Sequence, residues 1–252
     1  MKRIESEKIK FEKHKLIRSG LIILSAILLV TGVILLLIDP IKRMNRKRIS
    51  GSAVEIFDQK IAASETDAVE WTYVVPKNGN EVEGEGYDFI GNMDIEESEE
   101  DDSGDDGGYV TLNSIGILNI SSINCRYSVW DEATQVSLRY GLGHYVDSAM
   151  PGEYGNATIM GHNYRDGSMF HRLGEVSIGD TVEFYGSDGT YVSYHVVSSE
   201  IVSADDILDY ALTGSSDSIR LTLITCTYEY GMTGWRRVVI CEADDWYYQD
   251  HT

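Results

Sequence analysis

Three polar side chains of types suited to covalent catalysis stand at the ends of apolar segments. His162 follows a short apolar run, Cys226 ends a segment of alternating apolar and polar residues, and Arg236 opens the next such segment. A thiolate is a strong nucleophile that nearby positive charge stabilises, and a protonated histidine can give a proton to a leaving amine. Arginine stays charged and can donate hydrogen bonds to a carbonyl or a developing oxyanion. The set is consistent with thiol-based catalysis, and equally with a buried structural cysteine and two surface polar residues.

Chain spacing brings two of these residues together. Segments 218–226 and 235–241 are separated by one polar loop, so a hairpin between them would place Cys226 beside Arg236. The neighbouring Arg237 would face the opposite side of the strand, because successive side chains alternate. Only one of the two arginines can therefore reach the thiol. The approach of His162 does not follow from spacing alone.

The elements that must position these residues are short strands. From residue 109 the sequence is rich in valine, isoleucine, tyrosine and threonine, with frequent glycine, which is typical of strands and turns. Ser203 with Asp206 resembles a capping box before one short helix that ends near Gly214. Many short strands with one or two helices predict a mainly β fold, a closed or nearly closed antiparallel barrel. The predicted strands are 115–120, 125–130, 157–160, 181–185, 191–197, 218–226 and 235–241.

Three further histidines and the other two cysteines are interpreted as structural. His144, His171 and His195 lie in a strand end, a short helix and a strand. Cys125 and Cys241 fall among apolar strand residues and are most simply core thiols, with a disulfide between them as the alternative outside the cell. No metal-binding cluster or phosphate-binding glycine loop is present in the sequence, so no cofactor is expected.

The charge of the chain is divided. The 252 residues carry a formal net charge of -20, which argues against nucleic-acid binding. Residues 1–48, however, hold twelve basic and four acidic residues, whereas the remainder holds nine basic and 37 acidic ones. Two parts this different are expected to face different surroundings.

A membrane anchor fits this division. Residues 19–38 contain no charge and are apolar on every side, and about 20 such residues span a bilayer core of about 30 Å. A cleaved signal peptide is the alternative, but no small-residue cleavage site follows the run. We expect residues 1–18 to be a cytoplasmic basic segment, and the acidic remainder to lie outside a single-pass anchor.

Residues 39–108 are predicted to be a flexible linker. Residues 53–63 could form a short helix, whereas 92–108 has almost no apolar residues and nine acidic ones. Like charges repel and no core can form there, so this stretch is predicted to stay extended in water. The ordered pattern of a calcium-binding loop is absent from it. The catalytic domain is then expected over 109–252.

Several motifs resemble those of the sortases. The segments NATIMGHN (156–163), TLITCTYE (222–229) and WRRVVICEA (235–243) are similar to the histidine, cysteine and arginine motifs of that family. IGILNISSINCRYSVW (115–130) resembles its first strands, and LRYGLGHY (138–145) the segment before the histidine. The chain order of histidine, cysteine and arginine also agrees. The loops GHNYRDGSMF and TCTYE resemble class B sortases, although the span from His162 to Cys226 is short for their usual extra helix.

The resemblance implies an eight-stranded sortase barrel and a cysteine transpeptidase. Cys226 would attack the carbonyl of a sorting signal, typically between Thr and Gly, and His162 would protonate the departing amine. Arg236 would hold the carbonyl or the oxyanion, because its register places Cys241 at the family's small-residue position; Arg237 is the alternative. Thr225 matches a position that often lines the substrate site.

The resemblance also implies partners. These are the sorting-signal peptide of a surface protein, and an amine from peptidoglycan or a pilin subunit that resolves the thioacyl enzyme. Two other functions stay open at this point. One is an inactive, membrane-tethered binding module, and the other is a cysteine protease that uses water as acceptor.

Overall fold

The computed structural model describes residues 2–62, 71–76, 108–214, 217–227, 234–244 and 247, with α1 side chains described from 18 to 61. The chain forms two compact units, Met1–Lys47 and Arg48–Thr252. Each unit is described by itself below. The acidic stretch predicted to be extended, 92–108, lies outside the described residues except for its last glycine.

The first unit is the N-terminal part of helix α1 (Lys2–Ala62). The uncharged run 19–38 is helical throughout, and its large apolar side chains, such as Leu29 and Leu36, are exposed. The most apolar window of the segment Arg18–Ile61 has a mean hydropathy of 3.2. Length and composition therefore suffice for crossing a bilayer, although a signal sequence near an N-terminus has the same properties.

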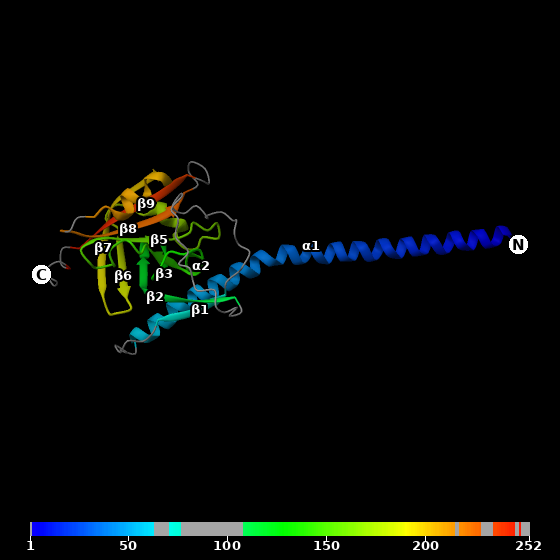
Figure 1. The fold of residues 1–252 in the computed structure, drawn as a ribbon, viewed down its shortest axis with the longest axis horizontal. Helices are drawn as coiled ribbons and strands as arrows, with labels where there is room; N and C mark the ends of the chain where they lie inside the picture. Colours follow the sequence, from blue (N-terminus) through cyan, green and yellow to red (C-terminus); the bar gives the residue numbers. More distant parts are fainter. Residues whose placement is uncertain are drawn as a thin grey trace. The chain divides into compact units, whose positions relative to one another are not determined.

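The second unit contains a closed β-barrel (Figure 1). Eight strands follow the order β2-β3-β4-β5-β8-β9-β7-β6, and pairing of β6 with β2 closes the ring. This confirms the predicted eight-stranded barrel. Its strands are β2 (Tyr109–Ile120), β3 (Cys125–Trp130), β4 (Leu142–His144), β5 (Gly155–Met160), β6 (Thr181–Gly186), β7 (Tyr191–Ser203), β8 (Ile219–Cys226) and β9 (Trp235–Ala243).

The prediction of an antiparallel barrel is wrong for two of the strand pairs. β3 pairs with β4, and β5 pairs with β8, in parallel. Parallel neighbours need a crossover connection, which local turn signals do not reveal. Between β3 and β4 the connection contains helix α2 (Gln135–Tyr140), which Thr134 caps by accepting from the Ser137 backbone N–H. Between β5 and β8 it contains β6, β7 and three short helices.

The remaining helices are short. η1 (Ser121–Ile123) joins β2 to β3, and η2 (Phe170–Glu175) lies between β5 and β6. The helix predicted after Ser203 is present as η3 (Ala204–Asp206) followed by α3 (Ile207–Leu212). The Ser203 hydroxyl caps it by accepting from the Asp205 backbone N–H at 3.3 Å.

Apolar residues pack on both faces of strand β8. Leu221 and Leu223 belong to the largest core cluster, which includes Phe170 and Val239. Ile224, one residue further, belongs to a second cluster that includes Ile207 of α3 and contacts half-buried Cys226. The alternation of β8 therefore places Ile224 and Cys226 on the face covered by α3, and Leu223 on the other.

Two segments inside the predicted linker have regular structure. Helix α1 continues to Ala62, and β1 (Thr72–Pro76) pairs antiparallel with the first part of β2. Ala53 and Phe57 of α1 are buried, and the Phe57 ring lies 4.8 Å from that of Trp71. Apolar spacing near 3.6 residues accounts for this buried helix face.

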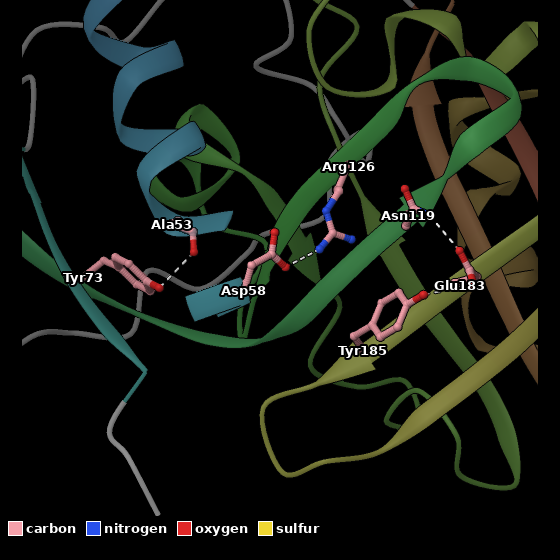
Figure 2. Close-up of polar contacts among 7 residues, drawn as sticks. All are labelled: Ala53, Asp58, Tyr73, Asn119, Arg126, Glu183 and Tyr185. Carbon is pink, nitrogen blue, oxygen red and sulfur yellow. Dashed lines mark hydrogen bonds and ion pairs between the residues drawn. The ribbon is translucent and has the colours of Figure 1, made fainter. Parts of the chain in front are cut away.

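Polar contacts attach the same segments to the barrel (Figure 2). The Tyr73 hydroxyl donates to the Ala53 carbonyl at 3.1 Å, and Asp58 forms an ion pair with Arg126 of β3. The Arg126 guanidinium also lies over the Tyr185 ring of β6. Residues 48–62 and 71–76 are thus part of the barrel domain in this structure.

Candidate active site

Cys226 and Arg236 lie directly opposite each other at one end of the barrel. They form the last pair of the antiparallel β8–β9 ladder, as the hairpin argument predicted. The next pair inward is Thr225 with Arg237. Because side chains alternate along a strand, Cys226 and Arg236 share one face, and Thr225 and Arg237 share the other. The connecting residues 228–233 lie outside the described part of the chain.

The parallel pairing of β5 with β8 brings His162 to the same end. Its last register pair is Met160 with Ile224, and the Gly161 backbone N–H donates to the Ile224 carbonyl at 3.1 Å. Two residues beyond that pair, the two chains reach His162 and Cys226. Chain spacing could not supply this parallel pairing, because β5 and β8 are far apart in sequence.

Gly161 allows the close packing just before the histidine. A Cβ atom at this position would lie 2.5 Å from the Leu142 side chain and 2.7 Å from that of Phe170. Any larger residue would therefore push the strand end away from its neighbours. The Gly-His pair combines close backbone approach with a half-buried imidazole.

The segment after His162 folds back on itself. The Phe170 backbone N–H donates to the His162 carbonyl at 3.0 Å, and Asn163 forms an isolated bridge with Met169. The His162 and Tyr164 rings have centroids 4.9 Å apart. These contacts hold the backbone of His162 and one side of its ring at the end of β5, the strand that pairs with β8.

The two arginines have different surroundings. Arg236 is only 1% exposed, and its Nη1 donates to the Trp235 carbonyl at 3.0 Å. Arg237 is half-buried, lies near Gly174 of η2, and donates from Nη1 to the Ser199 hydroxyl at 3.4 Å. A buried guanidinium on the same face as the thiol is well placed to donate hydrogen bonds to an oxygen bound there.

The other two cysteines differ from Cys226 in burial. None of the three cysteines forms a disulfide, so the alternative of a Cys125–Cys241 disulfide is not realised. Cys125 and Cys241 are buried in the main core, as core thiols should be. Burial disfavours the thiolate and raises the pKa of Cys125 to about 12, and it raises the pKa of Cys241 as well. Cys226 is the half-buried one.

Thr225 is buried and holds two strand ends together. Its hydroxyl donates to the Gly161 carbonyl at 2.7 Å. The bond joins the residue before Cys226 to the residue before His162. This hydrogen bond therefore holds the backbone next to Cys226 close to the backbone next to His162.

Sequence reasoning missed the contacts that Asn163 makes next to Cys226. Its Nδ2 donates to the Cys226 carbonyl at 2.9 Å, and its Oδ1 lies 2.9 Å from Nδ1 of His171. The sequence indicates Asn163 only as the last residue of the segment NATIMGHN, and it favours a structural role for His171. The signal available in the sequence was an amide directly after the histidine, with a second histidine eight residues later.

Two further histidines of the described residues have structural contacts. His144 is buried, with Nε2 2.9 Å from the Ala149 carbonyl and 3.2 Å from the Ser148 hydroxyl. His195 pairs with Asp244 at 3.1 Å. Within the described residues, no group of His, Cys, Asp and Glu is arranged to hold a metal ion.

Comparisons with known proteins match the barrel part of the chain. The family model "Sortase domain" matches residues 118–244. Sortase D of Bacillus subtilis (strain 168) is 34% identical over 124 residues, which cover 49% of this chain and 59% of that protein. This relative is a sortase D, whereas the motif loops resemble class B sortases. The class of this chain therefore stays a prediction.

Solved structures are also similar to part of the chain. A sortase D5 transpeptidase of Clostridium perfringens is 23% identical, with a TM-score of 0.47, over 52% of this chain and 79% of that one. Sortase C-1 of Actinomyces oris is 25% identical, with a TM-score of 0.47, over 52% of this chain and 75% of that one. The family model spans the strands that carry His162, Cys226 and Arg236, and on that match the chain belongs to the sortase family.

Proposed function

We propose that this protein is a cysteine transpeptidase that cleaves the sorting signal of a surface protein and joins the product to an amine. The observation that carries the proposal is the meeting of three strand ends at one point. Cys226 pairs with Arg236 across β8 and β9. His162 follows two residues after Met160, and Cys226 two residues after Ile224, the residue that pairs with Met160. Membership of the sortase family supports the same roles for these three residues.

The first half-reaction forms a thioacyl enzyme. The Cys226 thiolate attacks the scissile carbonyl, a C–S bond forms, and the oxygen takes the negative charge. The C–N bond then breaks, and protonated His162 gives its proton to the departing amine. The second half-reaction reverses these steps. An incoming amine attacks the thioester and a C–N bond forms, the C–S bond breaks, and the neutral His162 accepts the amine proton, which restores the thiolate and imidazolium.

Arg236 and Thr225 have supporting roles in this proposal. The guanidinium of Arg236 donates hydrogen bonds to the carbonyl oxygen as its charge develops. Its burial means that water competes poorly for those donors, which strengthens their effect. Thr225 contributes to the substrate site by fixing the ends of β5 and β8 through Gly161.

The location in the cell is part of the proposal. Residues 19–38 of α1 would form a single-pass anchor, with residues 1–18 cytoplasmic and the barrel domain extracellular. The large apolar side chains of this segment are exposed, as in Leu29 and Leu36, and this supports the anchor. Protease added to intact cells should remove the barrel domain and leave an anchored fragment. A shortened, soluble protein in the medium would contradict the anchor.

Product analysis tests the reaction. The full chain in detergent is incubated with peptides that carry Thr-Gly sorting signals, with and without a lysine or diaminopimelate peptide as acceptor. We expect an amide product that depends on the acceptor, and none from Cys226→Ala. A hydrolysis product that no acceptor diverts would favour a protease, and peptide binding without either product would favour the binding module.

A further inference from the structure

We propose that Asn163 is a positioning residue for Cys226, and that His171 acts by orienting the Asn163 amide. The inference rests on the proposed function, because it assigns Cys226 and His162 as the reacting pair. It concerns the two hydrogen-bonding ends of one side chain, which joins the loop after His162 to the strand end that carries the thiol.

The contacts dictate which way the amide points. The Cys226 carbonyl can only accept, so it takes a hydrogen from Nδ2 of Asn163 at 2.9 Å. That leaves Oδ1 facing Nδ1 of His171 at 2.9 Å, which must therefore carry the proton. An amide supplies one donor and one acceptor at a fixed separation, so both neighbours specify the same orientation.

The hydrogen bond from Asn163 lies at Cys226, the residue that carries the proposed nucleophile. The β5–β8 ladder and the Gly161 contacts hold the two chains together up to Ile224 and Thr225. The Asn163 amide adds a link one residue further along β8, at Cys226 itself. It fixes the backbone from which the sulfur projects relative to the backbone of His162, its chain neighbour.

The loop that presents Asn163 and His171 is held in a strained form. Met169 has φ 55°, a left-handed value that costs a side chain of this type and persists where the surroundings enforce it. The Asn163–Met169 bridge and the bond from Phe170 to the His162 carbonyl are such surroundings. The strained turn places His171 within reach of Asn163, eight residues earlier in the chain.

The helix that carries His171 has an anchor of its own, which supplies a matched control. Arg172 bonds Glu175 and also donates from Nη1 to the Ile123 carbonyl at 3.1 Å. A variant at Arg172 would loosen η2 without removing either end of the Asn163 amide bridge. It separates positioning of Cys226 from general stability of the loop.

The test is a mutant cycle on the full chain in detergent. The variants are Asn163→Ala, His171→Leu, their combination, His171→Gln and the control Arg172→Gln. Four quantities are measured for each: the acylation rate with a cleavable peptide, its KM, the thermal unfolding midpoint, and the rate of Cys226 alkylation by iodoacetamide. The alkylation rate needs no peptide, so it reports on Cys226 even if no sorting signal is cleaved.

We expect Asn163→Ala to slow acylation roughly tenfold at unchanged KM, the scale of one hydrogen bond that serves the transition state. His171→Leu should slow it roughly threefold, and His171→Gln, which keeps an N–H donor, should restore the rate. The double variant should be no slower than Asn163→Ala, because residues that act through one another are not additive. Alkylation of Cys226 should follow the same order.

Three results would overturn the inference. These are wild-type acylation and alkylation rates in Asn163→Ala, a double variant whose loss is the product of the two single losses, or an equal loss in Arg172→Gln. Failure of the wild-type chain to acylate any peptide would instead count against the proposed function. In that case the alkylation rates of the same variants still decide the role of Asn163.

Discussion

Cys226 and Arg236 form the terminal cross-strand pair of β8 and β9, with the buried guanidinium on the same face of the sheet as the thiol. Directly behind them, Thr225 and Arg237 form the next pair on the opposite face. The two adjacent arginines therefore have different neighbours, and substitutions at each should have different consequences.

The arginine variants test this difference through turnover. Arg236→Ala should lower turnover by roughly 10²–10³, the scale of removing one oxyanion donor. Arg236→Lys should recover little, because an ammonium cannot reproduce the planar donor fork. Arg237→Ala removes a long contact to Ser199 and should leave turnover nearly intact. Steady-state kinetics on all three variants would reverse the assignment if Arg237→Ala caused the larger loss.

Thiol labelling should be selective for Cys226. Cys125 and Cys241 are buried and their pKa values are raised by burial, so neither offers an accessible thiolate. The folded chain should take up one equivalent of iodoacetamide at neutral pH, and the chain in denaturant should take up three. Folded Cys226→Ala should take up none. Peptide mapping that located the folded-state label on Cys125 or Cys241 would contradict the assignment.

Alkaline pH should destabilise the barrel through its buried thiols. Burial raises the pKa of Cys125 from 9.0 to about 12, so between these values the unfolded chain has lost a proton that the folded chain keeps. Stability is therefore complete below about pH 9 and falls as the pH rises, by about 1.4 kcal/mol per pH unit for one such group. Urea unfolding from pH 9 to 11 should show a shallower decline for Cys125→Ala than for the wild-type chain. Equal slopes would mean that Cys125 ionises equally in both states.

Local sequence patterns predicted every barrel strand except β4, and half of the site. Cys226 and Arg236 lie on strands joined by one loop, so alternation and a hairpin fixed their pairing in advance. His162 lies at the same end of the barrel because of the parallel β5–β8 pairing, which joins segments more than 60 residues apart, as in Met160 with Ile224. No local period encodes such a pairing, and only the family resemblance supplied it.

The segments before residue 109 were harder to predict. Composition indicated a linker, yet Phe57 and Trp71 pack together and β1 extends the sheet beyond the barrel. Their burial depends on a surface formed by distant residues such as Leu112, Trp130 and Tyr140. A short helix or strand inside an acidic region gives little sign of such a partner, because its stability comes from tertiary packing.

The packed helix end can be tested by paired substitutions. Phe57 is 2% exposed, so Phe57→Ala should lower the free energy of unfolding of the barrel domain by about 3 kcal/mol. Asp58→Asn breaks an ion pair whose side chains are 37% and 52% exposed, and should cost less than about 1 kcal/mol. Urea unfolding followed by tryptophan fluorescence compares the two. Equal, small effects would show that residues 48–62 do not stabilise the barrel.

The central claim is that Cys226 carries the acyl group between two amines. Intact-mass measurement of the full chain, quenched in acid soon after mixing with a cleavable sorting peptide, tests it most directly. The account predicts a mass increase equal to the N-terminal peptide fragment, located on Cys226, that disappears as the amide product forms once an acceptor amine is added. Product formation without any adduct on Cys226, or an adduct on Cys125 or Cys241, would contradict it.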